Sequence, residues 1–320
     1  MNDKLKLTTG IDFRSAVSDQ EFSSVGFFGP YKSQYSSDSL KQNQVGFYAA
    51  LNYSDKNFNI ELGDRLNIHS AYGSYDVFNI NPSYVINKQV KLFANVSSGY
   101  RTPSLYQLFS EYGNRNLKPE AAITYEGGLQ YFSAGKKFTS RVVVFKRDVK
   151  DVIFFYFNSS TFQTQYINQD KQNDKGIELE ATYLAGKRLT LKAFYTYVTG
   201  EITTKTGSGK DTTYFNLLRR PKNSFGLNTS SRINNNFLVS TNLSIVGKRT
   251  DSYFDANTFR TVNTVLKSYA LWDIYAEYTF AKSKLKLFSD LRNILNSKYT
   301  EISGFNTLGF TANAGIRFSF

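Results

Sequence analysis

Cysteine is absent from this chain of 320 residues, and histidine, methionine and tryptophan each occur once. The absence of cysteine excludes a disulfide scaffold, thiol catalysis and a cysteine-based zinc site. The single histidine, His69, has no identifiable carboxylate partner, so the sequence indicates neither a Ser/His hydrolase pair nor a histidine-rich metal centre. We expect no catalytic residue, no cofactor and no bound metal. His69 is expected near the outer end of its strand, as a rim residue.

Long apolar runs are also missing. No stretch approaches the roughly 18 consecutive apolar residues of a membrane helix, and the mean hydropathy is negative. A helical membrane protein is thereby excluded, whereas a soluble β protein and a membrane β-barrel both remain, because barrel strands are apolar only at every second position. The segment from Met1 to Leu7 has no apolar leader region, so we expect Met1 to be an internal start or a fragment boundary.

The charge balance is strongly basic, with a formal net charge of +13 from 39 Lys and Arg against 26 Asp and Glu. Such a surplus suits nucleic acid, an acidic membrane surface or a polar lumen. The basic residues stand on alternating positions or in turns, in runs no longer than two, which argues against a nucleic-acid partner.

Aromatic residues are abundant, with 28 Phe and 23 Tyr, and they take part in an alternation of period two. The same alternation passes through Leu179 and Tyr183 and through Trp272 and Ile274. In the last segment one face carries only apolar side chains, namely Phe310, Ala312, Ala314, Ile316, Phe318 and Phe320. A period of two is that of a β-strand, so we expect these apolar side chains to face outward together.

This pattern predicts fourteen strands, at 3–17, 42–54, 57–70, 76–87, 89–100, 121–133, 137–157, 164–185, 188–202, 213–232, 236–253, 264–280, 284–300 and 308–320. Short turns at 54–57, 87–89, 134–137, 185–188, 234–236 and 281–284 alternate with connections that are mostly longer, at 18–41, 101–120, 203–212 and 255–262. Outer-membrane barrels keep short periplasmic turns and longer external loops. We therefore predict an all-β, transmembrane antiparallel β-barrel with both ends of the chain on the periplasmic side.

The opposite face of the strands is charged, which supports the membrane interpretation. Burying that face in a dry core would be costly, whereas a wet or plugged lumen accepts it. Asp64 is an exception with lipid-facing parity, for which we expect a bulge or a rim position. The charged face carries Arg141, Arg147, Glu178, Glu180, Lys192, Asp273, Glu277, Asp290 and Arg292.

The segments GYRTPSLYQL at 99–108 and GNRNLKPE at 113–120 resemble segments of the TonB-dependent outer-membrane receptors. The first is similar to the family's GFRAPSL.EL, and the second is similar to GNPNLKPE, with Arg115 in place of proline. A third segment, 293–299, resembles NLFDKKY. The matching residues are Gly99, Arg101, Pro103, Asn114, Asn116, Pro119 and Glu120.

This resemblance implies a twenty-two-stranded barrel with an amino-terminal plug, of which residues 1–320 form the carboxy-terminal fourteen strands. The missing plug would contact the TonB complex, so this part alone should not transport. Outer-membrane lipid and lipopolysaccharide would surround the barrel in the bacterial outer membrane. The end of the chain resembles the signal that the barrel assembly machinery reads, with Asn313, Gly315, Phe318 and Phe320.

Within the family, the chain is similar to the vitamin B12 (cobalamin) receptors at 217–220, 271–273 and 304–307. The resemblance implies that Arg219 and Phe305 contact the small-molecule ligand, and less directly Val246 and Gly247. Ferric-siderophore receptors share most of these motifs. Both a cobalamin receptor and a siderophore receptor therefore remain open.

Other interpretations also remain open. One is a passive fourteen-stranded channel, in which the first and last strands pair with each other. Another is a barrel phospholipase or protease, for which the chain lacks the necessary catalytic residues. The loop 101–120 either binds ligand or is only shaped by Pro103, Gly113 and Pro119. Four aromatic residues of the first long loop either form an apolar mouth for a ligand or pack on one another: Phe27, Phe28, Tyr31 and Tyr35. The carboxylates of the same loop have a spacing that matches no calcium-binding loop: Asp19, Glu21 and Asp38. Aromatic residues near strand ends are expected to form a girdle at the membrane interface: Tyr53, Tyr131, Tyr183, Tyr278 and Phe320.

Overall fold

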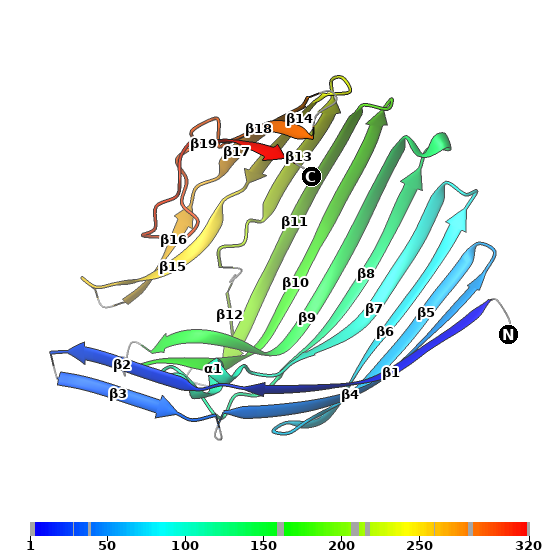
Figure 1. Ribbon diagram of the computed structural model, residues 1–320. Coiled ribbons are helices and arrows are strands. Elements are labelled where there is room, and N and C mark those ends of the chain that lie inside the picture. Colours follow the sequence, from blue (N-terminus) through cyan, green and yellow to red (C-terminus); the bar gives the residue numbers. More distant parts are fainter. Residues whose placement is uncertain are drawn as a thin grey trace.

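A computed structural model describes residues 4–27, 29–37, 40–158, 163–205, 211–214, 218–258, 260–280 and 284–318. Most of these residues lie in strands, which form one antiparallel sheet of fifteen strands and two separate hairpins. Figure 1 shows the large sheet as a row of long, tilted strands. Within the described ranges, no helix has the length and apolar character needed to cross a membrane.

Fourteen strands of the large sheet follow one another along a single path, and β12 (Asp211–Tyr214) pairs beside it with β11. The expected all-β fold with fourteen successive strands is confirmed. The path is β1 (Leu5–Val17), β4 (Lys41–Asp55), β5 (Phe58–His69), β6 (Gly73–Ile86), β7 (Val90–Arg101), β8 (Glu120–Phe132), β9 (Phe138–Asn158), β10 (Gln163–Ala185), β11 (Leu189–Lys205), β13 (Asn223–Arg232), β14 (Phe237–Val246), β17 (Tyr269–Thr279), β18 (Leu285–Arg292) and β19 (Thr311–Phe318).

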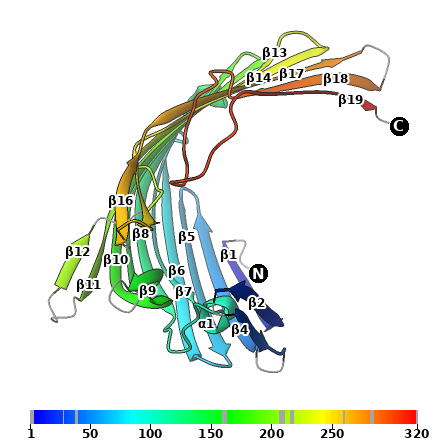
Figure 2. The same ribbon diagram turned by 90° about the vertical axis from the view of Figure 1, so that its left-hand side faces the viewer.

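The large sheet is a curved, open trough in which β1 and β19 form the two edges (Figure 2). In the described part of the chain these two strands do not pair with each other. The expected alternation of connections is confirmed, since one end of the trough carries the short turns and the other carries most of the long connections (Figure 1). We call these the short-turn end and the loop end.

Several predicted strand boundaries are wrong at the loop end. The expected strands 236–253 and 264–280 each combine two strands, because β15 (Arg249–Asp255) and β16 (Arg260–Leu266) leave the large sheet as a separate hairpin. The strand β14 ends just before Gly247, where a Cβ atom would lie 2.7 Å from the carbonyl oxygen of Asn223. Alternation alone cannot locate such a break, since both sheets have the same period.

Other departures have similar causes. The strand expected at 213–232 begins only at Asn223, after Pro221, which has no N–H to donate to a ladder. The strand expected at 284–300 ends at Arg292. The loop 18–41 contains a hairpin of β2 (Gln20–Gly26) and β3 (Gly29–Tyr35), and the loop 101–120 contains the short helix α1 (Leu105–Phe109). A single helical turn, η1 (Ala134–Lys136), joins β8 to β9.

The cross-strand register places the predicted apolar side chains on one face of the sheet. Trp272 lies opposite Leu243, Leu179 opposite Val142, and Ile316 opposite Leu287. The exposed fraction is 69% for Ile316 and 38% for Trp272, so these side chains do not gather in a closed interior. The expected outward-facing set is therefore confirmed for the members that the structure describes, which leaves out Phe320.

The two faces also differ in crowding. Side chains converge on the concave side of a curved sheet and spread apart on its convex side. The face with the charged side chains also carries the buried residues Asn67, Val143 and Val198, whereas their apolar neighbours on the other face are exposed. The more crowded, charged face is therefore the concave one.

Asp64 lies on the convex face, in the middle of β5. The register continues through it without interruption, with Ala49 opposite on β4 and Phe78 opposite on β6. The expectation of a bulge or a rim position is therefore wrong. Asp64 is an exposed carboxylate in a regular stretch of strand.

Aromatic rings cover glycines on the concave face. Phe194 on β11 lies directly opposite Gly226 on β13, and a Cβ atom on this glycine would overlap the ring. Phe93 and Phe288 cover Gly128 and Gly315 in the same way. A ring lying flat over a glycine fills the space of the missing side chain and fixes the register of the two strands.

We predict that Gly226→Ala lowers the free energy of unfolding by about 1–3 kcal/mol, because the added methyl group displaces the Phe194 ring. The same change should cost much less in a Phe194→Leu background. Gly127→Ala is the matched control, because a Cβ atom there would meet nothing within 4 Å. Urea unfolding of the full-length receptor in lipid vesicles measures all four variants. An equal cost of Gly226→Ala in both backgrounds would contradict the prediction.

Candidate functional site

Two buried aspartates organise the loop end of the sheet between β10 and β19. Asp251 on β15 has an exposed fraction of 0%, and Asp174 on β10 one of 2%. A buried carboxylate is costly unless charged or N–H donors surround it. The residues that supply those donors therefore define this region.

Asp251 joins three separate segments. Its Oδ1 atom accepts hydrogen bonds from Nε of Arg219 at 2.7 Å and from the N–H of Ser252 at 2.8 Å. Its Oδ2 atom accepts from the N–H of Ser303 at 2.7 Å, in the connection between β18 and β19. Burial raises the pKa of this carboxyl, but the hydrogen bonds from Ser303, Arg219 and Ser252 together outweigh it and hold the pKa below the ordinary value.

Asp174 is held from the neighbouring strands. It accepts hydrogen bonds from Arg147 on β9, whose Nε lies at 3.0 Å, and from Nε2 of Gln172 at 2.9 Å. Arg220 approaches the same carboxylate, with Nη1 at 4.0 Å from Oδ2. Gly200 on β11 leaves room for the carboxylate, because a Cβ atom there would overlap Oδ1.

The consecutive residues Arg219 and Arg220 therefore connect the two aspartates. Arg219 has a φ of +61°, a left-handed conformation that a non-glycine residue rarely adopts. Its N–H donates to the carbonyl oxygen of Thr250 at 2.7 Å, which ties this turn to β15. The side chains of both arginines remain about half exposed.

A fourth arginine lies beside this pair. Nη2 of Arg249 donates to the carbonyl oxygen of Thr300 at 2.7 Å, and its guanidinium lies 4.8 Å from the ring centroid of Tyr269. Tyr269 in turn stacks on Tyr299, at 4.4 Å between centroids. Arg147, Arg219 and Arg220 thus face two buried carboxylates, and Arg249 lies beside them on β15. We call these six residues the arginine cluster, and its charge is net positive.

The residues that the sequence predicted to bind ligand lie around the arginine cluster. Arg219 belongs to it, and Phe305 follows Ser303 by two residues, with an exposed fraction of 67%. Val246 ends β14, and the N–H of Gly247 donates to the carbonyl oxygen of Asn223 at 2.9 Å, close in sequence to Arg220. Arg219 lies in a turn and Phe305 in a loop, so both are in connections rather than within a strand. Leu217, part of the motif at 217–220, lies outside the described residues.

Sequence reasoning missed Asp174, Asp251 and Arg249. None of them stands in a recognisable motif, and the predicted strand 236–253 placed Asp251 inside the wall rather than on a separate hairpin. The only signal in the sequence was the arginine pair itself. Asp174 precedes Arg220 by 46 residues and Asp251 follows Arg219 by 32 residues, and only the fold brings these partners together.

The family-like segments at 99–108 and 113–120 build structure. Arg101 and Glu120 form a two-pronged ion pair, with contacts of 2.6 and 2.7 Å, and Glu120 also accepts the N–H of Ile153 at 2.7 Å. The side chain of Asn114 donates to the carbonyl oxygen of Tyr166 at 3.0 Å. Glu120 is also the first residue of β8.

A small apolar core lies beneath this loop, formed by Leu108, Leu117 and Ile153. The remaining matched residues fall in the same region. Pro103 is fully buried, Gly99 lies opposite Ala122 in the β7–β8 ladder, and the N–H of Asn116 donates to the side chain of Asn114 at 2.9 Å. Pro119 immediately precedes β8.

Residues of the terminal signal lie on both faces of β19. Asn313 is opposite Asp290, Gly315 is covered by Phe288, and Phe318 lies opposite Leu285 on the convex face. Phe320 lies outside the described residues.

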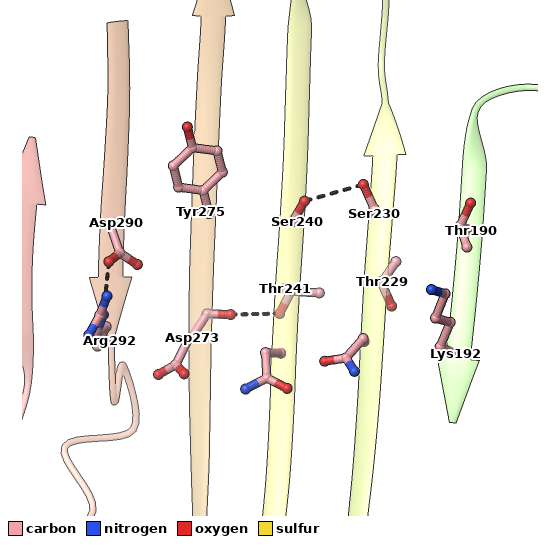
Figure 3. A pocket seen from close by; sticks show the side chains of 12 residues that line it. Thr190, Lys192, Thr229, Ser230, Ser240, Thr241, Asp273, Tyr275, Asp290 and Arg292 are labelled. Atoms are coloured by element: carbon pink, nitrogen blue, oxygen red, sulfur yellow. Dashed lines mark hydrogen bonds and ion pairs between the residues drawn. The ribbon is translucent and has the colours of Figure 1, made fainter. Parts of the chain in front are cut away.

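The concave wall between β11 and β18 carries a shallow polar hollow of about 730 Å³. Figure 3 shows its side chains spread over neighbouring strands, with Lys192 at one side and Arg292 at the other. Arg292 pairs with Asp290 at 2.8 Å, and the hydroxyl of Thr241 donates to the carbonyl oxygen of Asp273 at 2.9 Å. The hydrogen-bond donors of the hollow do not point toward a common centre. We therefore interpret it as part of the sheet surface and not as a binding site.

Other residues singled out from the sequence take local roles. His69 ends β5, and its Nδ1 accepts the N–H of Ala71 at 3.1 Å. Asp19 accepts the N–H of Ser37 at 2.5 Å, and Glu21 pairs with Lys32 at 3.0 Å. Asp38 and Phe28 lie outside the described residues.

The aromatic groups divide in the same way. Tyr35 packs against Phe109, at 6.1 Å between centroids, and Tyr31 against Phe22 at 6.1 Å, whereas Phe27 is exposed. Tyr31 and Tyr35 thus pack within the loop end, and an apolar mouth for a ligand stays a prediction. The expected girdle tyrosines face outward, with exposed fractions of 45% for Tyr183 and 40% for Tyr278.

The model of one protein family matches most of this chain. That family is described as TonB dependent receptor-like, beta-barrel, and the match covers residues 2–294. Similar solved structures include the ferric enterobactin receptor PfeA from Pseudomonas aeruginosa and the copper transporter OprC, each with a TM-score of 0.74 and 18% identity. The ferripyoverdine receptor of the outer membrane of Pseudomonas aeruginosa matches with a TM-score of 0.70 and 18% identity.

These three matches cover 100%, 99% and 88% of this chain. They cover 52%, 54% and 39% of the other chains, so this chain spans about half of their length or less. At this level of identity the likeness shows the fold alone.

We predict that the three segments joined at Asp251 separate in acid. A carboxyl whose folded pKa is depressed stabilises the fold above its ordinary pKa, and that contribution is lost as the pH falls through the folded pKa. Amide hydrogen exchange of Ser252 and Ser303 should therefore lose protection below about pH 3.8. In Asp251→Asn the protection should be weaker at pH 7 and insensitive to this fall. Asp255→Asn, at the exposed hairpin tip, is the control and should leave both amides protected at pH 7.

Proposed function

The chain belongs to the family of TonB-dependent receptor-like β-barrels, and from this premise we propose that it is the barrel part of an outer-membrane receptor for a scarce metal chelate. The members of this family are transport receptors rather than enzymes. The apolar convex face supports a membrane location, and the polar concave face supports a water-filled or plugged interior.

The arginine cluster is the observation that favours one class of ligand. Three arginines face two carboxylates and a fourth, Arg249, lies beside them, and both Arg219 and Arg220 keep about half of their side chains exposed. A net positive cluster at a loop end attracts anionic solutes, and exposed guanidinium N–H groups bind their oxygens. We therefore propose an anionic ferric siderophore as the ligand. The names of two similar structures, an enterobactin and a ferripyoverdine receptor, agree with this choice.

Cobalamin is the second candidate ligand. It is supported by the positions of Arg219, within the arginine cluster, and of Phe305 near it. Nε of Arg219 is already bonded to Asp251, which leaves its terminal nitrogens for amide or phosphate oxygens of a ligand. Phe305 offers an exposed ring without a hydroxyl group. Such a contact suits a large ligand with both apolar and amide surface.

Transport would require the rest of the receptor. We propose that a plug inside the barrel contacts TonB, that outer-membrane lipid and lipopolysaccharide surround the convex face, and that the assembly machinery recognises β19. A passive fourteen-stranded channel is less well supported, because β1 and β19 do not pair in the described sheet.

We predict that Arg220→Ala and Arg219→Ala each weaken binding of ferric enterobactin to the full-length receptor about tenfold or more. Loss of a charge-assisted hydrogen bond costs roughly 1.5–3 kcal/mol, which corresponds to that change. Phe305→Ala should affect cyanocobalamin more than the siderophore, because its contact is apolar. Tryptophan fluorescence titration with each ligand provides the affinities.

Arg188→Ala, at the short-turn end, is the control for loss of one positive charge and should bind both ligands like the unchanged receptor. Tight binding of cyanocobalamin without binding of the siderophore would select the second candidate. Unchanged affinities for both ligands in folded Arg219, Arg220 and Phe305 variants would refute the proposed site.

A further inference from the structure

The convex face carries a group of lysines on two neighbouring strands. The register of β9 and β10 places Lys146 directly opposite Lys175 and Lys150 directly opposite Lys171. All four side chains are exposed and share the parity of the outward-facing Val142 and Leu179. We call them the lysine quartet. Its two pairs are four residues apart along the strands, or about 13 Å.

Like charges directly opposite each other destabilise a pair of strands. Among the described side chains on this face, the carboxylates of Asp148 on β9 and Glu201 on β11 lie near the quartet. Asp148 pairs with Lys146, with 2.9 Å between Oδ2 and Nζ. Within the described residues, Lys150, Lys171 and Lys175 have no ion pair with any carboxylate. The quartet therefore retains a positive charge that no described side chain neutralises.

The position of the quartet along the strands is informative. Toward the short-turn end, the same face is apolar, with Val144 exposed by 56% and Leu179 by 37%. Tyr125 lies opposite Lys146, and Tyr197 lies opposite Ile177, so aromatic rings mark the border. The order of apolar, aromatic and basic side chains corresponds to the hydrocarbon, interface and headgroup layers of a membrane.

The surface at this border is also hollowed. A pocket of about 300 Å³ is lined by Lys146, Asn173, Asp174, Lys175, Thr199, Gly200 and Glu201. Of its two carboxylates, Asp174 is already paired with Arg147. The two ammonium groups, with the amide and hydroxyl groups beside them, suit a phosphate oxygen rather than a hydrocarbon chain.

We propose that the lysine quartet binds the phosphorylated headgroup of a lipid in the outer leaflet of the membrane. One phosphate lies between Lys146 and Lys175 and a second between Lys150 and Lys171, which relieves the repulsion within each pair. A glycolipid with two phosphates engages both pairs at once. The proposal rests on the membrane location of the convex face and is independent of which chelate the arginine cluster binds.

The test uses the full-length receptor in mild detergent and native mass spectrometry with diphosphorylated lipid A. Two double variants remove one pair each: Lys146→Gln with Lys175→Gln, and Lys150→Gln with Lys171→Gln. The matched control is Lys6→Gln with Lys91→Gln, which removes two lysines from the concave face. We expect each quartet variant to bind lipid A at least tenfold more weakly, and the control to bind it normally.

Lipid A from which both phosphates have been removed should bind poorly to the unchanged receptor. Inorganic phosphate at millimolar concentration should not displace lipid A, because the hydrocarbon chains lie against the apolar face beside the quartet. Equal binding of dephosphorylated lipid A, displacement by inorganic phosphate, or undiminished binding by both quartet variants would overturn the proposal. Siderophore binding by the same variants reports separately on the arginine cluster, so failure of one site is distinguishable from failure of the other.

Discussion

The structure depends on the pairing of every strand with its neighbour, because backbone N–H and C=O groups inside a membrane have no water to bond with. A continuous ladder from β1 to β19 meets that need and leaves each strand only two faces. One face must then suit hydrocarbon and the other water. Outward side chains such as Ile316 and inward ones such as Asp290 follow directly from this constraint. Curvature adds the third condition, since rings such as Phe194 fit the crowded concave face only over glycine.

The loop end obeys a different rule, because there the chain leaves the ladder and loses its regular partners. Carboxylates that accept several hydrogen bonds connect the segments there instead. Glu120, at the start of β8, accepts the N–H of Ile153 and so holds the part of β9 that extends beyond β8. Asp251 accepts the N–H of Ser303 and so joins the connection after β18 to the β15–β16 hairpin. Asp174 anchors Arg147 within the wall. Each of these carboxylates collects a guanidinium group, which leaves arginines concentrated where a solute would enter.

The sequence predicted the ladder well and the loop end poorly, for a physical reason. Parity is a local property, so Trp272 and Leu179 could be assigned to one face without knowledge of their neighbours. A carboxylate partner is a long-range property, and nothing near Asp251 in the sequence points to Arg219 or Ser303. The β14–β15 break was missed because a free hairpin alternates as a membrane strand does. Asp64 was misjudged because a bulge seemed necessary for a charge on the convex face, whereas the register there is regular.

Charge on the convex face separates into two kinds when position along the strand is considered. Asp64 stands in mid-strand among apolar neighbours such as Phe78, where a carboxylate has no counter-charge in the register beside it. The lysine quartet stands beyond the aromatic border, where long side chains can reach the headgroup layer. Pairing lysine with lysine weakens the ladder unless an anion lies between them. With the two proposed sites, the loop end would bind anions both at the arginine cluster and, on the convex face, at the lysine quartet. Arginine, with its planar fork of donors, suits a fixed chelate, and lysine, as a flexible point charge, suits a mobile lipid phosphate.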